Sequence, residues 1–322
     1  MSGPGRRGAP LLRALGLRLV GFGATLVGAS LLLHGLLLLA PGDPIDLIPD
    51  GESSRAELAA EFGLDRPPLE RLVGGAIGAL TGELGPSLIV APGTPVSELV
   101  RRACWRSAMI VGPALPIALL AGLGAALLSA GRSSALRSFI QIIGALPVFL
   151  LAWALVTALN AGAWALIERG AIPRPEWFAL PDQASALRTA LAVLAVVLGS
   201  GTLFEVHAAC EAEILRLRES ELADATAGLG LAFWPVLLRN LAPGLLSIAR
   251  DRVAFLVGGL VVVEKVLLMG GAGALLWQAA LARDYPLAIG LGVAAAAVVA
   301  GGAFLADALR LALDPRARVE GA

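Results

Sequence analysis

The residues that could do chemistry are few in this sequence, and their spacing excludes most catalytic sites. The chain has two histidines, two cysteines and a single lysine, Lys265. A phosphate-binding P-loop needs a lysine directly before a serine or threonine, but Val266 follows Lys265, so the chain cannot hydrolyse ATP by itself. Cys104 and Cys210 are too few for a disulfide framework, and the two histidines do not have zinc-ligand spacing. We therefore expect no cofactor and no structural metal.

Ser200 is the candidate nucleophile, because it lies between Gly199 and Gly201 and the histidines could act as a base. A rhomboid-like Gly-x-Ser-Gly pattern requires a glycine at position 198, and Leu198 stands there. No pair of intramembrane aspartates is evident either. An intramembrane hydrolase is therefore an alternative whose site is poorly specified.

The composition is that of a membrane protein. Apolar residues make up 57% of the 322 residues and charged residues 16%, and the mean hydropathy is +0.80. Ordinary globular chains contain about 45–50% apolar and about 25% charged residues. The 25 basic and 25 acidic residues cancel, which leaves no electrostatic footprint for nucleic acid.

The apolar residues are collected into six runs, and each predicts a transmembrane helix. The first, residues 19–40, is free of charge and long enough to cross about 30 Å of hydrocarbon. The fifth is short, and extends only if Arg250, Asp251 and Arg252 lie near an interface or pair with one another. The remaining runs are 107–131, 139–167, 189–204, 253–263 and 287–306.

Arginine placement predicts the orientation of these spans. Four arginines precede the first run without any acid among them, which predicts a cytoplasmic N-terminal segment, residues 1–18. Six spans then return the tail, residues 307–322, to the same side. The membrane domain covers 19–306, and the long loop 41–106 is extracytoplasmic. In that loop Ser54-x-x-Glu57 is a capping box, which predicts a short helix at about 54–62.

The segment 208–243, between spans four and five, concentrates charge in a chain that is otherwise poor in it. Ser220 can cap a short helix at 221–229, which Gly230 ends with a sharp turn. A second helical stretch, 232–241, leads to Pro243. A short amphipathic helix on a glycine turn suits docking into a groove of a soluble partner. On pattern alone, a surface helix that covers the bundle is an equal interpretation.

This segment resembles the EAA loop of ABC importer permeases, which reads Glu-Ala-Ala-x-x-x-Gly, nine residues, then Ile-x-Leu-Pro. The resemblance places Asp224, Ala225 and Thr226 at the first three positions, Gly230 at the glycine and Pro243 at the proline. Further motifs occur in the order of the dipeptide/oligopeptide/nickel permease family. They are Pro41-Gly42-Asp43-Pro44, Gly63-Leu64-Asp65-Arg66-Pro67, Gly82-Glu83-Leu84-Gly85-Pro86-Ser87, Val261-Val262-Val263-Glu264, Leu281-Ala282-Arg283-Asp284-Tyr285-Pro286 and Leu313-Asp314-Pro315-Arg316.

The resemblance covers roughly residues 15–318, and the long first outside loop is similar to that of the first, B-type, permease subunit. It implies an all-α, polytopic membrane protein with about six transmembrane helices and the ABC type I importer permease fold. It further implies a subunit of the bacterial inner membrane, surrounded by lipid and paired with a second permease, two cytoplasmic ABC ATPases and an extracytoplasmic substrate-binding protein. The solute would be a peptide or a similar small molecule, and the 221–243 loop would couple to the ATPases.

The sequence departs from the family pattern at several positions. Asp224 is shorter than glutamate, Thr226 replaces alanine, and the basic residues common before the loop glycine are absent. An inactive membrane scaffold is therefore a further alternative. In span three, Pro147 and Phe149 match a family kink that could line a gate. Glu264 could gate or meet the binding protein, although solvation at the interface or pairing with Lys265 explains it equally well.

The two histidines have structural explanations as well as functional ones. His34 lies within span one, where it could bind transported metal, since nickel permeases belong to the same family. We expect packing with one interhelical hydrogen bond instead, both for His34 and for His207 at the cytoplasmic end of span four.

Overall fold

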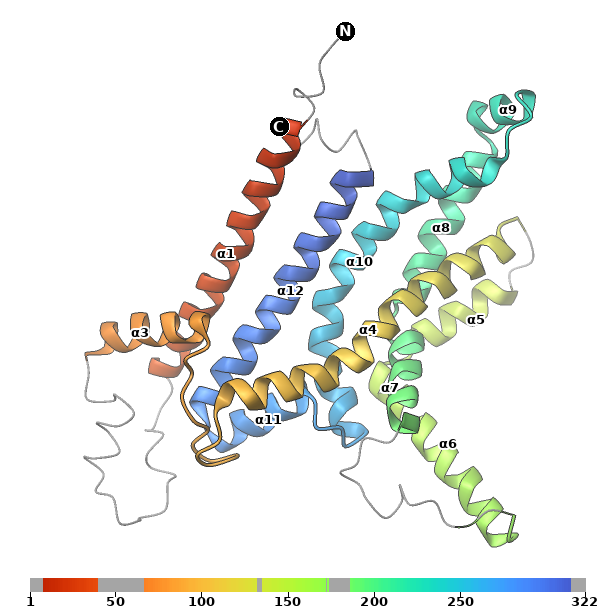
Figure 1. Cartoon of the computed structure of the whole chain (residues 1–322). Coiled ribbons are helices and arrows are strands. Elements are labelled where there is room, and N and C mark those ends of the chain that lie inside the picture. Colours follow the sequence, from red (N-terminus) through yellow and green to blue (C-terminus); the bar gives the residue numbers. More distant parts are fainter. Residues whose placement is uncertain (1–7, 40–66, 132–134, 172, 174–185, 314–322) are drawn as a thin grey trace. The chain divides into compact units, whose positions relative to one another are not determined.

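The computed structural model describes residues 8–39, 67–131, 135–171, 173 and 186–313 (Figure 1). Within these ranges every regular element is a helix, apart from one isolated β-bridge between Pro86 and Pro95, which confirms the all-α prediction. The helices are α1 (Gly8–Leu39), α3 (Pro68–Thr81), α4 (Val96–Ser129), α5 (Ala135–Gly144), α6 (Val148–Glu168), α7 (Ala186–Gly199), α8 (Thr202–Arg218), α9 (Glu221–Gly228), α10 (Phe233–Val266), α11 (Ala272–Ala282) and α12 (Tyr285–Leu313). The predicted helix at 54–62 lies outside the described residues.

Four of the described helices are long and apolar enough to cross a membrane: α1 over Arg13–Leu36, and α4, α6 and α12 over their whole lengths. Helices α7 and α8 are bent by 44° relative to each other, and together they make a fifth span if the bent pair is counted as one membrane crossing. The predicted run 253–263 lies inside α10, which has 34 residues and would extend about 51 Å. Its additional charged residues, including Arg250 and Arg252, keep α10 out of that count.

Two spans that the sequence predicts as continuous, 139–167 and 189–204, are each broken. The kink expected at Pro147 is a complete break between α5 and α6, because proline lacks an N–H and disfavours helix in the residue before it. At the second break Gly201 has a φ of +73°, a left-handed conformation that separates α7 from α8.

The helices fall into two compact units, which we describe separately. Among the described residues, the first comprises those within 1–17, 108–269 and 302–322, and the second comprises those within 18–107 and 270–301. The core of the first unit joins α4, α6, α7 and α10 around Ile110, Ala195 and Val263, and a second cluster joins α4, α8 and α10 around Ile214. At Gly122 of α4, a Cβ atom would stand 2.8 Å from Leu203 O of α8, so the two helices pack closely there.

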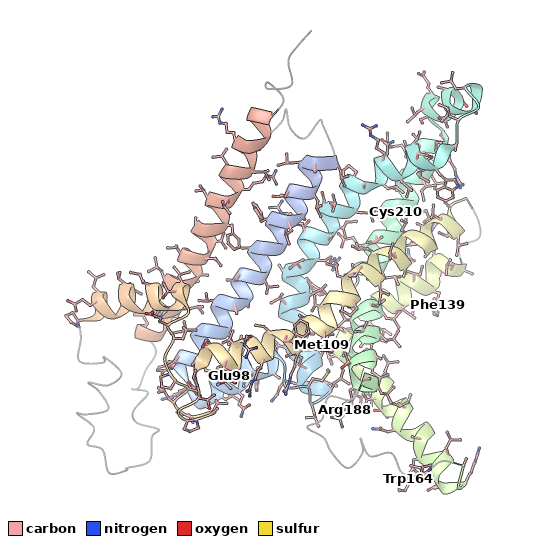
Figure 2. The ribbon with its side chains drawn as sticks, in the orientation of Figure 1. Glu98, Met109, Phe139, Trp164, Arg188 and Cys210 are labelled. Atoms are coloured by element: carbon pink, nitrogen blue, oxygen red, sulfur yellow. The ribbon has the colours of Figure 1, made fainter. Side chains whose placement is uncertain are left out.

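Within the first unit the two helix breaks lie against each other. An added Cβ at Gly199 would meet Val148 Cα and Leu151 of α6 at 2.8 Å, and one at Gly144 would meet Phe204 of α8 at the same distance. Glycine at these positions therefore allows backbones to approach closely. On the other side, α6 is mostly exposed; Trp164, near its end, is 54% exposed (Figure 2). Such a face needs lipid or another apolar partner.

The second unit is built around Val96, Ala103, Ala279, Leu287 and Leu291, which α4, α11 and α12 contribute. The segment before α4 folds back over this core, with Val96 N donating to Gly85 O at 3.0 Å. α4 begins at Val96, eleven positions before the predicted span at residue 107, because the apolar face of its first turns is buried in this core.

Candidate coupling and translocation site

The coupling segment has the predicted helix and the predicted glycine turn. α9 has eight residues and ends at Gly228, and Gly230 adopts a φ of +67°. Gly230 N donates to Ala227 O and Leu231 N donates to Thr226 O, both at 3.0 Å, which is the pattern of a Schellman stop. The predicted cap is wrong, since Ser220 Oγ donates instead to Leu217 O at 2.6 Å. Glu221 and Asp224 still place negative charge at the positive end of α9.

The second predicted stretch, 232–241, is longer than expected. It begins at Phe233 and continues as α10 through Pro243 to Val266. α8 likewise occupies 208–218 of the predicted loop, so most of 208–243 is helical and only short links join the three helices (Figure 1).

The predicted coupling residues do not all face the same way. Thr226 is buried, and its hydroxyl donates to Leu222 O, whereas Asp224, Ala225 and Gly230 are exposed. Around them lies an apolar tip that we define as Leu222, Leu229, Leu231 and Trp234, each between 44% and 73% exposed. A helix end that contacts only α8 and α10 among its recorded neighbours and exposes this tip is suited to a partner's groove.

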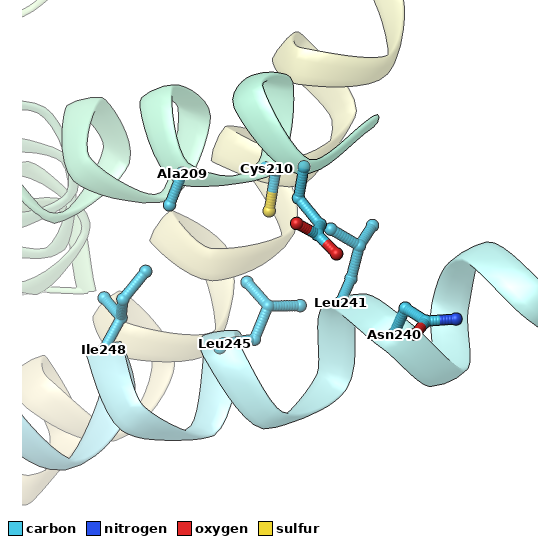
Figure 3. Close-up of a pocket in the computed structure, with 8 residues that line it drawn as sticks. Ala209, Cys210, Asn240, Leu241, Leu245 and Ile248 are labelled. Carbon is cyan, nitrogen blue, oxygen red and sulfur yellow. The ribbon is translucent and has the colours of Figure 1, made fainter. Parts of the chain in front are cut away.

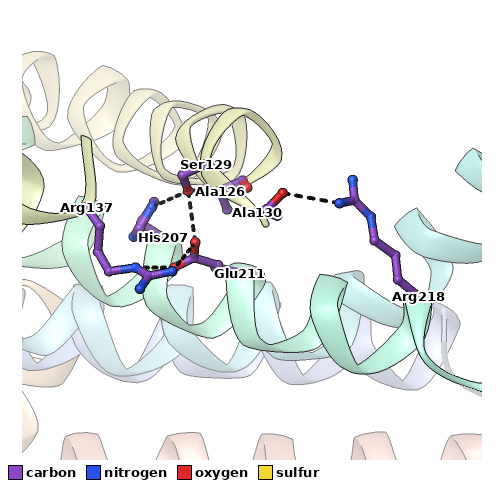
Figure 4. A network of polar contacts seen from close by, with 7 residues as sticks. All are labelled: Ala126, Ser129, Ala130, Arg137, His207, Glu211 and Arg218. Atoms are coloured by element: carbon purple, nitrogen blue, oxygen red, sulfur yellow. Dashed lines mark hydrogen bonds and ion pairs between the residues drawn. The ribbon is translucent and has the colours of Figure 1, made fainter. Parts of the chain in front are cut away.

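A polar network holds α4, α5 and α8 together near the coupling segment (Figure 4). Glu211 of α8 accepts two hydrogen bonds from Arg137 of α5, at 2.9 and 2.7 Å, and a third from Ser129 of α4 at 3.2 Å. His207 Nε2 is 2.9 Å from Ser129 Oγ, as expected for a packed histidine with one interhelical bond. The hydrogen bond to Glu211, and then the attraction of its charge, raises the pKa of Arg137 above its usual value.

Arg252 joins α10 to the break between α7 and α8. Its Nη1 donates to Ser200 O at 3.1 Å, its Nε donates to Glu205, and its guanidinium lies 5.4 Å from the centroid of the Phe255 ring. The sequence left open whether Arg250, Asp251 and Arg252 pair with one another or lie near an interface, and both arginines have ion-pair partners on other helices. Arg250 pairs with Asp307 of α12. Counting the charges along a single apolar run does not identify ion-pair partners on other helices.

The residues proposed for a gate lie apart from the coupling segment. Pro147 is exposed at the start of α6, and Phe149 in the first turn is 43% exposed. Glu264, near the end of α10, is fully buried, so solvation at an interface does not explain it.

The remaining candidates for chemistry have structural roles. Ser200 is 4% exposed and its hydroxyl donates to Thr202 Oγ1 at 2.8 Å, whereas His207 is bonded to Ser129. In the second unit His34 Nδ1 is 2.8 Å from Ser30 O, and the ring fills the space over Gly75 of α3. No group of three or more potential metal ligands occurs among the described residues.

Asp284 has a structural role that its sequence motif does not reveal. This fully buried residue at the start of α12 accepts hydrogen bonds from Ser87 Oγ and from the backbone N–H of Leu88, Ile89 and Val90. It therefore joins two motifs that lie almost 200 positions apart in the chain. An acid two residues before a proline was the available signal, but nothing in the sequence pointed to its partner.

Comparison with known proteins agrees with this arrangement. A Brucella ovis protein named as a peptide permease is 29% identical over 320 residues, covering 94% of this chain and 97% of the relative. The Bacillus subtilis oligopeptide transport system permease protein AppB is 26% identical over 303 residues, covering 90% and 94%. The family described as binding-protein-dependent transport system inner membrane component matches residues 114–319, which include α5 to α12. With its apolar helices, the chain belongs to this family of ABC importer permeases and is a membrane transport subunit rather than an enzyme.

Proposed function

We propose that this chain forms, with a second permease, the path by which an ABC importer carries peptides or a similar small solute across the inner membrane. The family membership gives the transport role, and the full-length relatives that are named as peptide permeases support the peptide substrate. The N- and C-terminal segments, 1–18 and 307–322, are cytoplasmic, and the loop 41–106 faces the opposite side. An extracytoplasmic binding protein delivers the solute.

The observation that carries the coupling role is α9 on its left-handed turn. Its apolar tip docks into a groove on a cytoplasmic ATPase, and Asp224, Ala225, Thr226, Gly230 and Pro243 form the coupling loop. Two ATPases, one for each permease, supply the movement. Thr226 faces inward and fixes α9 from within, while the exposed positions meet the partner.

A gate formed at the break between α5 and α6 fits the same scheme. Pro147 and Phe149 are exposed where α6 begins, so they are available to the solute or to the second permease. Glu264 is buried, and as a gate residue it would act by stabilising one arrangement of α10 rather than by touching a soluble partner.

The pair Gly230→Ala and Gly228→Ala tests the coupling role. An added Cβ meets nothing within 4 Å at either position, so the two variants differ only in backbone conformation. Gly230 has a φ of +67°, and alanine in this left-handed backbone conformation costs about 1–2 kcal/mol. That cost lowers the population of the turn by about 5–30-fold. At Gly228, inside α9, alanine is tolerated or favourable.

The measurement is uptake of labelled peptide by cells, together with recovery of the ATPase on the tagged chain. We expect Gly230→Ala to lose uptake or ATPase binding and Gly228→Ala to keep both. Unchanged uptake in Gly230→Ala would show that the coupling assignment is wrong. If the unmodified chain recovers no ATPase from membranes in which other complexes survive, the importer function is rejected. The chain is then better interpreted as a membrane scaffold.

A further inference from the structure

A groove between α8 and α10 contains a cavity of about 310 Å³ in the first unit (Figure 3). Leu241, Leu245 and Ile248 of α10 give it an apolar side, and Asn240 of α10 and Glu213 of α8 add polar groups to its lining. Ala209 of α8 and Gly244 of α10 are both exposed and line it as well. Because these two residues are small, the facing helices leave an open slot rather than a filled seam.

The groove is apolar in the middle and charged at both ends. Glu213 lines the cavity at one end and is bonded to Arg216. One helical turn beyond the other end lie Glu205, four positions before Ala209, and Arg252, four positions after Ile248. The side chains of Arg252 and Glu205 are 21% and 40% exposed, so this ion pair is open to a ligand.

We propose that the α8–α10 groove is a binding station for a short zwitterionic peptide, with the peptide carboxylate at Arg252 and its ammonium at Glu213. This inference rests on the proposed function and adds the residues that touch the substrate. Glu205 and Glu213 are eight positions apart on α8, or about 12 Å along the helix. An extended peptide covers about 3.3–3.6 Å per residue, so the groove matches three residues.

Arg252 has the capacity to take a carboxylate without losing its present partners. Its bonds to Ser200 O and Glu205 use three of the five guanidinium N–H groups. The remaining two, one on each terminal nitrogen, suit a planar carboxylate. An ion pair in a candidate membrane span is costly, and charged residues in such spans commonly mark functional sites, of which contact with a charged substrate is one kind.

Cysteine accessibility tests this site directly. Ala209→Cys places a thiol in the cavity, and Ala208→Cys places one on the next, exposed residue that does not line it. Both are made with Cys104 and Cys210 replaced by alanine, in membranes that contain the whole complex. The probes are a small methanethiosulfonate reagent, tri-alanine, and tri-alanine amide, which lacks the carboxylate.

We expect tri-alanine to slow modification of Ala209→Cys and to leave Ala208→Cys unchanged. The amide should protect about tenfold less well, because it lacks a charged hydrogen-bond acceptor. Arg252→Gln should remove the difference between the peptide and its amide, whereas Arg250→Gln, on the same helix and paired with Asp307, should preserve it.

Three results would overturn the proposal: equal effects on both cysteines, no protection at all, or a cysteine at 209 that never reacts. The last would mean that lipid or a helix of the second permease fills the groove. ATPase recovery and ATP hydrolysis are measured on the same membranes. A complex that hydrolyses ATP but shows no protection rejects this site alone, whereas absence of the ATPase rejects the importer function.

Discussion

Replacement of Asp284 by alanine should release the segment that precedes α4. The Asp284 side chain accepts from four donors of that segment, namely Ser87 Oγ and three successive backbone N–H groups, and from a fifth, Leu287 N of α12, at 3.4 Å. It is fully buried, and a buried carboxylate is costly unless it is hydrogen-bonded. Loss of the carboxylate leaves the amides of Leu88, Ile89 and Val90 unsatisfied.

The size of the effect follows from those bonds. A hydrogen bond to a charged group contributes about 1.5–3 kcal/mol, but bonds that share one acceptor are not additive. Even about 1 kcal/mol for each of the four gives about 4 kcal/mol, which is about a thousandfold in the equilibrium for local opening. Asp284→Asn keeps one carbonyl acceptor without the charge and should fall between the wild type and Asp284→Ala.

Hydrogen exchange of the protein in lipid nanodiscs measures this opening. The amides of Leu88, Ile89 and Val90 should exchange up to about a thousandfold faster in Asp284→Ala, while amides in the middle of α12 stay protected. Glu83→Ala, a change at an exposed side chain of the same segment, serves as control. If exchange at these three amides accelerates less than about tenfold, equivalent to about 1.4 kcal/mol, Asp284 does not hold the segment and the reasoning fails.

Two more predictions concern the packing of the first unit. Gly122→Ala should lower the melting temperature in detergent, because the new Cβ would lie 2.8 Å from backbone and side-chain atoms of α8 and overpacking costs about 1–3 kcal/mol. Gly124→Ala, with nothing within 4 Å, should not lower it, and equal effects would contradict close packing of α4 on α8. Ser129→Ala should destabilise by about 1–3 kcal/mol, since buried His207 and Glu211 each lose a partner. The control is Thr25→Ala, which removes an exposed hydroxyl of α1. Equal free energies of unfolding for the two variants would show that the network contributes little.

Local features of the coupling segment could be predicted from the sequence because their causes lie within a few residues. The glycine after α9 specifies a left-handed stop, and Glu221 and Asp224 mark the positive end of the helix. The apolar runs likewise predicted the long helices, since hydrocarbon thickness sets their length. The error at Ser220 is of the same local kind: a serine has two nearby backbone choices, and it donates backward to Leu217 O.

Contacts between distant segments could not be predicted, because nothing local specifies the partner. Arg252 could have paired with its neighbour Asp251, but it lies beside Glu205 and the carbonyl of Ser200. Pro147 and Gly201 can be recognised in the sequence as positions where a helix can break. The packing of the two breaks against each other depends on glycines that allow close approach, and the sequence does not show which helices approach. The sequence therefore indicated where the chain bends but not what each bend contacts.

These long-range contacts give the coupling proposal a mechanical basis. α8 runs without interruption for 17 residues, about 25 Å, from the left-handed break at Gly201 to the coupling segment. α10 leaves the same segment and reaches Arg252, which bonds to both sides of that break. A displacement of α9 therefore acts on the break through two continuous helices, which pack against each other around Ile214 and Leu241 and are joined at the break by the Arg252–Glu205 pair. If that pair also binds the peptide terminus, occupancy of the groove and the position of α9 favour one another, since any two events that bias the same bend are reciprocally linked.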